Sequence, residues 1–428
     1  MGMNVCVIGA GYVGLTTSAV LASQGHNVQC VEKDQEKVER LKSGHVPIYE
    51  PGLDAMVQSN VNNKQLIFVP EMREAVKQSE IIFIAVGTPS LEDGRTNLRY
   101  IEQVLQELAT IITSYKVIVS KSTVPIGTNE WMEKKLLQEG LKQGQFDLIS
   151  NPEFLREGTA IADMLSPDKI VLGVKDASNV SLMKQLYHFS PAPYIITSFN
   201  GAELIKYASN AFLAVKISFM NEMALLSEHF DINVQDISEG LKTDPRIGPL
   251  FLQAGLGYGG SCLPKDVSSL IKQGEEVGYV PQLVETAQRV NEQMVEVYID
   301  KIKQILVDPK HKKVAVWGAS FKPNTDDTRH SRAIQLIKRL VELKSHVQVY
   351  DPVVKLEWNE VTEYNDLYQA VHGVDLLIVA TEWEEFTKAD WNLVKEKMDG
   401  SMIIDARNVL KCSDLEKYEL QLVGIGRG

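Results

Sequence analysis

The strongest constraint on the fold is a glycine-rich turn between a short apolar run and an apolar helical stretch. Residues 4–8 (NVCVI) are predicted to form a buried strand, and Gly9-Ala-Gly11-Tyr-Val-Gly14 and the helical stretch Leu15–Ser23 follow directly. In this order the glycines form a GxGxxG fingerprint, because they let the backbone approach a pyrophosphate at a helix N-terminus. A second strand, Asn27–Val31, ends at Glu32, whose carboxylate can bind a ribose and repel a 2′-phosphate. The sequence therefore predicts a dinucleotide-binding domain that prefers NAD to NADP.

Further strand-sized apolar runs continue the pattern at residues 81–86, 116–120 and 147–150. Each of these runs ends in small polar residues. In open parallel sheets the ligand crevice lies beyond the carboxyl ends of the strands. We therefore expect four polar residues to face one cleft: Thr88, Thr123, Glu153 and Glu157. For the two threonines, ordinary turn and cap chemistry is an equally good interpretation.

A second α/β domain is predicted in the C-terminal part of the chain. The stretch 308–313 is charged and contains proline, and strands are expected at 313–317, 346–351, 375–380 and 402–405. The turn after the first of these strands lacks the second and third glycines of the fingerprint, so its ligand contact must differ. Three nearby cations are suited to phosphates, although scattered solvated charges are the alternative: Lys322, Arg329 and Arg332.

Residues 201–230 are apolar almost all the way round, which predicts a long helix buried between domains or subunits. Lys206 and Asn210 are four residues apart and share one face of this helix. Because burying an unpaired ammonium is costly, Lys206 must either reach solvent along its stem or face a polar cleft that holds negative charge.

The stretch Gly255–Asp266 (GLGYGGSCLPKD) carries glycines at four positions together with Cys262, Lys265 and Asp266. A thiol near a lysine and the exposed amides of a glycine-rich turn can be held partly as a thiolate, which is the nucleophilic form. The segment therefore predicts a catalytic cysteine. The alternative is a flexible linker with an incidental cysteine.

The fold class expected from these patterns is α/β, with two doubly wound Rossmann-like domains joined by a long central helix and a small helical region. We expect an NAD-binding domain at 1–200, a central helical domain with the cysteine loop at 201–305, and a second Rossmann-like domain at 306–428. A length of 428 residues is in keeping with two to three domains.

Charge and cysteine usage narrow the function classes. A net charge of −12 opposes binding to nucleic acid or to an anionic membrane surface. The cysteines at positions 6, 30, 262 and 412 show no CxxC pair and no zinc spacing, which favours a reducing compartment and no metal site. No apolar run approaches the roughly 20 residues that span a bilayer. We expect a cytoplasmic protein without a signal peptide.

With these residues placed, the chain resembles the UDP-glucose 6-dehydrogenase family, within the wider group of nucleotide-sugar 6-dehydrogenases that act on UDP-N-acetylhexosamines and GDP-mannose. The resemblance runs nearly end to end. It rests on GAGYVGL at Gly9, VGTP at Val86, KSTVP at Lys121, NPEFLREG at Asn151, AELIKYASNAFLA at Ala202, GYGGSCLPKD at Gly257 and FKPNTDD at Phe321.

The resemblance implies a four-electron oxidation of a sugar C6 alcohol to a carboxylate, with two NAD⁺ used at one site. It implies that Cys262 captures the intermediate aldehyde and carries it as a thiohemiacetal and then a thioester. Lys206 and Asn210 would stabilise the oxyanion at C6, and Asp266 with a water would handle protons. Glu153 would be the base for thioester hydrolysis, with Thr123 helping to position the water.

The resemblance also implies binding residues. Around NAD, beside Gly9, Gly11 and Gly14, it places Val13, Glu32, Lys37, Thr88, Thr123, Glu157, Lys265 and Arg329. Around the nucleotide sugar it places Glu153, Phe154, Leu155, Arg156, Glu157, Lys206, Asn210, Phe251, Leu252, Gln253, Ala254, Gly255, Gly259, Lys322 and Arg407. The resemblance assigns dimerisation to the central domain (201–305) and UDP-sugar binding to the last domain (306–428). The long helix is expected to form a homodimer, in which Arg246 reaches the partner's substrate site.

Two departures from the family pattern stand out. After Arg329 the family commonly has an acidic residue, a small residue and often a proline, whereas this chain has His330-Ser331-Arg332, an extra cation that can alter a phosphate or sugar contact. Glu32 stands where many relatives have Asp, which should preserve the ribose contact at slightly longer reach.

Several functions stay open at this point. UDP-glucose is the expected substrate, and a UDP-N-acetylhexosamine or GDP-mannose is the alternative. A single-hydride dehydrogenase of the hydroxyacid type would leave Cys262 structural. An idle NAD-responsive interaction protein is disfavoured because Cys262, Lys206, Asn210 and Asp266 occur together.

Overall fold

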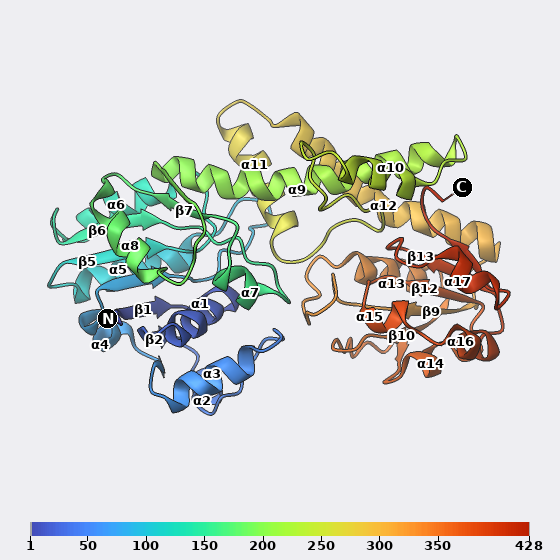
Figure 1. Cartoon of the computed structure of the whole chain (residues 1–428), viewed down its shortest axis with the longest axis horizontal. Helices are drawn as coiled ribbons and strands as arrows, with labels where there is room; N and C mark the ends of the chain where they lie inside the picture. Colours follow the sequence, from blue (N-terminus) through green and yellow to red (C-terminus); the bar gives the residue numbers. More distant parts are fainter. Residues whose placement is uncertain (1, 428) are drawn as a thin grey trace. The chain divides into compact units, whose positions relative to one another are not determined.

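The computed structural model describes residues 2–427 and contains two compact units, which divide between Ser209 and Asn210. The division falls inside the longest helix, α9 (Phe199–Glu228). In Figure 1 the colours run from the N-terminal sheet, which begins in blue at β1, through this green helix to the C-terminal sheet, drawn in orange and red. The predicted fold class is confirmed in its two doubly wound sheets and its long central helix.

The first unit is built on a sheet in the order β3-β2-β1-β4-β5-β6-β7-β8. All pairs are parallel except β6 and β7, which meet at one antiparallel bridge between Ser150 and Gly173. The chain leaves β1 in one direction and returns to β4 on its other side, so the switch point of the sheet lies between them. The strands are β1 (Asn4–Ile8), β2 (Asn27–Val31), β3 (Leu66–Val69), β4 (Ile81–Ile84), β5 (Lys116–Ser120), β6 (Phe146–Ser150), β7 (Ile170–Gly173) and β8 (Tyr194–Thr197).

Helices cover both faces of this sheet, so its central strands are apolar on both sides. In β1, Val5 and Val7 pack into one hydrophobic cluster, whereas Cys6 and Ile8 pack into the cluster on the opposite face. The helical segments are α1 (Tyr12–Ser23), α2 (Gln35–Lys42), α3 (Leu53–Asn62), α4 (Met72–Gln78), α5 (Arg99–Ile111), α6 (Thr128–Gln138), α7 (Ala160–Leu165), the short 3₁₀ helix η1 (Ala177–Asn179) and α8 (Val180–Leu186).

The second unit carries an all-parallel sheet in the order β11-β10-β9-β12-β13-β14. Its core includes Trp317 on β9, whose ring lies 5.4 Å from that of Phe386 and 5.9 Å from that of Trp391. The strands are β9 (Lys313–Trp317), β10 (His346–Tyr350), β11 (Val361–Glu363), β12 (Leu376–Val379), β13 (Met402–Asp405) and β14 (Gln421–Val423). The helices are α10 (Val234–Lys242), α11 (Leu263–Glu276), α12 (Gln282–Leu306), α13 (Arg332–Glu342), α14 (Leu367–Ala370), α15 (Glu384–Thr387), α16 (Trp391–Lys397) and α17 (Cys412–Glu416).

Helix α9 is long, as predicted, but it is not buried on all sides. It exposes four large apolar side chains at spacings of seven or eight residues, which places them on one side of the helix: Leu204, Phe212, Phe219 and Leu226. Among residues 2–427, no helix combines the length and the apolar character needed to cross a membrane.

Candidate active site

The glycine turn after β1 has the geometry that a dinucleotide requires. Gly9 has a φ of +104°, and a Cβ added at Gly14 would lie 1.8 Å from the carbonyl oxygen of Gly9. A Cβ at Gly11 would meet nothing within 4 Å in the protein. Two glycines are therefore needed to close the turn, whereas Gly11 keeps the backbone open to a ligand. Helix α1 begins at Tyr12 rather than at Leu15, so Val13 lies in its first turn and the helix N-terminus directly adjoins the turn.

The acid at the end of β2 is held in place by a lysine. Glu32 pairs with Lys37 at 2.9 Å, and both side chains are half-buried. Lys37 lies in the first turn of α2, and its amide donates to Asp34, the N-cap residue. This arrangement fits the ribose-binding role expected of Glu32, and it places Lys37 at the same carboxyl edge of the sheet.

The loops that follow β4 and β5 are tied to each other. The hydroxyl of Thr88 donates to the carbonyl of Thr123 at 2.8 Å, and that of Ser122 donates to Val86 at 2.7 Å. The side chain of Thr88 therefore has a structural role, because it links the two loops. A cofactor role for either threonine stays a prediction, and the side chain of Thr123 is half-buried at this edge.

Lys206 on α9 does not reach solvent. Its ammonium lies 2.9 Å from a carboxylate oxygen of Glu153, and both side chains are about 5% exposed or less. The other oxygen of Glu153 accepts from the amide of Leu155 at 2.6 Å, and the ammonium lies 5.3 Å from the ring centroid of Phe154. Burial alone would raise the pKa of Glu153, but the charge and hydrogen bond of Lys206, helped by the Leu155 amide and the charge of Lys121, hold the pKa below its usual value. Glu153 is therefore an anion beside a buried cation.

A second buried lysine, Lys121, belongs to the same cluster and was missed as a site residue. Its ammonium donates to Asn151 at 3.1 Å, and the hydroxyl of Tyr187 donates to the same amide oxygen at 2.7 Å. Burial lowers the pKa of Lys121 to about 8, although the charge of Glu153 works in the opposite direction. The available signal was a charged residue directly after the apolar strand β5, within KSTVP.

In the second unit, Cys262 is the N-cap residue of α11. The thiol is half-buried, and the hydroxyl of Ser261 lies 3.5 Å from it. One turn along the helix, the buried Asp266 accepts from Asn210 at 2.6 Å and pairs with Lys265 at 2.6 Å. The free amides and positive dipole end of a helix N-terminus favour a thiolate. Cys262, Asp266, Lys265 and Asn210 are thus brought together.

The glycine segment before Cys262 is a buried and firmly bonded loop, so the alternative of a flexible linker is wrong. Residues 254–260 are all buried. The amide of Gly255 donates to Asn221 at 2.8 Å, and that of Tyr258 donates to Asn291 at 2.8 Å. Gly260 has a φ of +84°, and a Cβ there would lie 2.7 Å from the ring of Phe321. The glycines are required by close packing.

Two arginines support this loop from within the same unit. Arg332, which the sequence offered as an extra cation for phosphate, is buried and donates to the carbonyl of Tyr258 at 3.1 Å and to Gln335 at 2.7 Å. Burial lowers its pKa. Arg407 donates to the carbonyls of Ala380, Gly257 and Phe321 at 2.9–3.0 Å. The departure at position 332 therefore fastens the cysteine loop.

Three other expected binding residues are exposed arginines, each paired with a nearby carboxylate at 2.6 or 2.7 Å. The pairs are Arg156 with Asp163, Arg246 with Asp244, and Arg329 with Asp327. Of these, Arg246 has the most exposed side chain, at 87%. Their ligand contacts stay predictions.

The remaining residues expected to bind the nucleotide sugar or NAD differ in their burial. Leu155, Glu157, Phe251 and Lys322 are half-buried, Leu252, Ala254 and Gly259 are buried, and Gln253 is exposed. The ammonium of Lys322 lies 5.5 Å from the ring centroid of Phe321.

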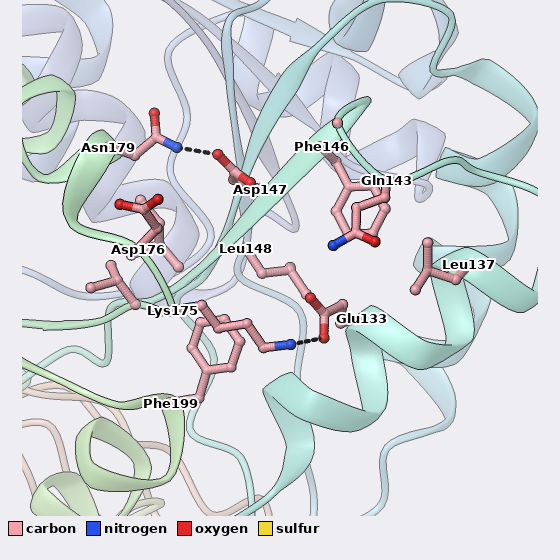
Figure 2. Close-up of a pocket in the computed structure, with 13 residues that line it drawn as sticks. Glu133, Leu137, Gln143, Phe146, Asp147, Leu148, Lys175, Asp176, Asn179 and Phe199 are labelled. Atoms are coloured by element: carbon pink, nitrogen blue, oxygen red, sulfur yellow. Dashed lines mark hydrogen bonds and ion pairs between the residues drawn. The ribbon is translucent and has the colours of Figure 1, made fainter.

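A separate cavity of about 250 Å³ lies at the amino edge of the first sheet, where β6 begins (Figure 2). Its polar side chains already bond to one another: Lys175 to Glu133, and Asn179 to Asp147. The glycine turn and the Glu153 cluster follow the carboxyl ends of strands, so this cavity is not part of the candidate site.

A doubly wound domain with a glycine turn at its switch point and an acid after β2 defines the class of NAD-binding dehydrogenases. Comparison with known proteins narrows the class. Three models of the UDP-glucose/GDP-mannose dehydrogenase family match: the NAD binding domain at residues 3–190, the central domain at 200–293 and the UDP binding domain at 315–412.

Individual proteins similar to this chain match it over almost their full length. A UDP-glucose 6-dehydrogenase of Rhizobium meliloti is 41% identical, over 99% of this chain and 100% of its own. The solved structure of a UDP-glucose dehydrogenase from Pyrobaculum islandicum superposes with a TM-score of 0.91 at 35% identity, covering 100% of this chain and 98% of its own. A UDP-D-ManNAc dehydrogenase structure from Pyrococcus horikoshii gives 0.90 at 29% identity, with 100% of both chains covered. The chain belongs to the UDP-glucose/GDP-mannose dehydrogenase family, and it is an NAD-dependent oxidoreductase.

Proposed function

We propose that the protein oxidises UDP-glucose to UDP-glucuronate in two successive two-electron steps, with Cys262 holding the intermediate. The observation that carries this proposal is the position of Cys262 at the N-terminus of α11, one turn before a buried Asp266 bonded to Asn210 and Lys265. That setting suits a thiolate nucleophile with proton-handling groups beside it.

The proposed reaction consists of two hydride transfers, one covalent capture and one hydrolysis. Bound NAD⁺ supplies a hydride acceptor, once for the alcohol and once more for the thiohemiacetal. Between these oxidations the Cys262 thiolate attacks the C6 aldehyde, so that a C–S bond forms and the carbonyl oxygen takes a proton. Water then breaks the C–S bond of the thioester, giving the carboxylate and the thiol. Covalent capture keeps a reactive aldehyde from escaping between the oxidations.

The charged groups have separate tasks in this scheme. Lys206 and Asn210 stabilise negative charge on the C6 oxygen, since fixed donors at developing charge lower the barrier most. Asp266 exchanges the proton of that oxygen through water. Glu153 accepts a proton from the hydrolytic water, which Thr123 positions. Its pKa is below the usual value while Lys206 pairs with it, so substrate must draw Lys206 towards the C6 oxygen before Glu153 acts as a base.

UDP-glucose is proposed as the substrate because relatives with that name match end to end, whereas the UDP-D-ManNAc dehydrogenase structure is less identical to this chain. The test is an NADH assay over UDP-glucose, UDP-N-acetylglucosamine, UDP-N-acetylmannosamine and GDP-mannose. We expect turnover of UDP-glucose with two NADH per sugar. Preference for another sugar would overturn the substrate, and one NADH per sugar would overturn the thioester route.

The cysteine is tested by Cys262→Ser, with Cys412→Ser, an exposed cysteine in α17, as the matched control. An alkoxide is far harder to form than a thiolate, so we expect kcat to fall by about 10³-fold or more, while the Kd of NADH stays within about twofold. Full turnover by Cys262→Ser, or an equal loss in Cys412→Ser, would contradict the role. Loss of NADH binding would mark the loop as structural.

We further propose that the protein works as a homodimer in the cytoplasm and that Arg246 serves the partner's substrate site. Arg246 is highly exposed on its loop after α10, and α9 exposes a stripe of apolar side chains that pairing with a second copy would bury. The domain limits proposed are 1–200, 201–305 and 306–428, with the last binding the UDP moiety.

A further inference from the structure

A buried carboxylate outside the expected site bonds to two loops of the first unit at once. Glu50, in the segment between α2 and α3, is 4% exposed. One carboxylate oxygen accepts from the hydroxyl of Tyr12 and from the amide of Gly158, the latter at 2.5 Å. The other accepts from the amide of Ala160 at 2.7 Å. The amide of Gly158 also lies 2.8 Å from the hydroxyl oxygen of Tyr12.

The two loops are those that the proposed reaction uses for cofactor and sugar. Tyr12 directly follows Gly11, the open position of the dinucleotide turn, and starts α1. Gly158 directly follows Glu157 and ends the 153–158 loop, and Ala160 starts α7. Helices α1 and α7 pack against each other in this unit (Figure 1).

The hydrogen bonds of Glu50 can couple the positions of the two loops. A buried carboxylate that loses a donor keeps its desolvation cost without compensation, so its donors are held firmly. Burial, followed by the bond to Glu50, raises the pKa of Tyr12, so the phenol stays protonated and donates. Any shift of Tyr12 on cofactor binding would therefore act on Gly158 through the carboxylate of Glu50.

We propose that Tyr12 and Glu50 are positioning residues that couple the two ligands: cofactor bound in the glycine turn orders the 153–158 loop and so raises the affinity for the nucleotide sugar. This inference rests on the proposed function. Coupling free energies are reciprocal, so the sugar must tighten cofactor binding by the same factor.

The test uses NADH and UDP-glucose, which cannot react with each other, and titration calorimetry on the full chain. In the wild type we expect saturating NADH to lower the Kd of UDP-glucose by about fivefold or more. In Tyr12→Phe, which keeps the ring and removes the hydroxyl, the factor should fall towards one, while each Kd measured alone changes by about twofold or less. Glu50→Gln should lose the coupling as well.

Tyr115→Phe is the matched control. It also removes a phenol–carboxylate bond, Tyr115 to Asp147 at 2.6 Å, but directly before β5, at the amino edge of the sheet. We expect it to keep the wild-type coupling. Equal coupling in the wild type and Tyr12→Phe, or a wild type without coupling, would overturn the inference, as would an equal loss in Tyr115→Phe.

Hydrogen exchange with NADH alone gives a readout that does not depend on the sugar. NADH should slow exchange in residues 153–165 of the wild type and of Tyr115→Phe, but not of Tyr12→Phe. Failure of UDP-glucose to bind would count against the proposed substrate, whereas NADH-induced protection that persists in Tyr12→Phe would count against the coupling.

Discussion

Lys206 shows how a lysine is kept on a mainly apolar helix: a buried carboxylate, Glu153, lies within ion-pair distance of it. The sequence indicated that Lys206 needed a partner, and the family resemblance supplied a chemical role. Neither identified Glu153 as the partner, because an ion pair between residues 53 positions apart depends on how β6 and α9 pack.

Substitution Lys206→Ala should lower kcat by about 10²- to 10³-fold and change KM much less, because the lysine acts chiefly on charge that develops in the transition state. The measurement is steady-state kinetics with UDP-glucose, with a thermal melt to confirm folding. The exposed Lys134→Met in α6 is the control. A raised KM with unchanged kcat would mean that Lys206 only binds substrate.

Lys121 predicts a dependence of stability on pH. Its folded pKa of about 8 lies below the roughly 10.4 of an unfolded lysine. Between these values the unfolded chain binds more protons, so this lysine makes the folded state more stable as pH rises from about 8 to about 10. Between pH 8 and pH 10 the free energy of unfolding of the wild type should therefore rise by about 3 kcal/mol relative to that of Lys121→Met. Urea denaturation at several pH values checks this, and parallel curves for the two proteins would contradict it.

Among the structural elements, the glycine loop 254–260 was recognisable from its composition, but its packing was not. Four glycines just before Cys262 marked the segment, but a flexible linker and a packed turn share that composition. What distinguishes them is the set of partners, Asn221, Asn291 and Arg332, which come from α9, α12 and α13.

Substitution Gly260→Ala should lower the free energy of unfolding by about 2–4 kcal/mol, because it adds a clash with Phe321 to the cost of a positive φ. Gly278→Ala is the matched control in the same unit. Gly278 has a φ of +77° and open space around its Cβ position, so about 1 kcal/mol is expected. Equal losses measured by urea denaturation would show that packing against Phe321 adds nothing.

Most strands were predictable because buried parallel strands are short apolar runs that end in glycine or small polar residues. The strands that the patterns did not mark are mainly short and near sheet edges, such as β8 and β11, which are only partly buried. The role of Glu50 had no sequence signal either, since an acid before Pro51-Gly52 looks like an ordinary turn residue.

For the whole molecule, the stripe of exposed apolar side chains on α9 predicts the state of assembly. Phe212→Glu places a charge on a side chain that is 63% exposed in the single chain, so it should leave the fold intact and prevent two copies from pairing. Sedimentation should give twice the 47.8-kDa chain mass for the wild type and the single mass for the variant. Tyr100→Glu, an exposed aromatic on α5, is the control and should keep the wild-type mass.

Helix α9 also sets a limit on how this chain can change length. Lys206 bonds within the first unit and Asn210 within the second, and about one helical turn separates them. Adding or deleting one residue between them would rotate one side chain by about 100° relative to the other. Exposed loops can accept insertions, but the helical turn between Lys206 and Asn210 fixes the angle between their side chains. An insertion or deletion should therefore be tolerated less well between Lys206 and Asn210 than in an exposed loop.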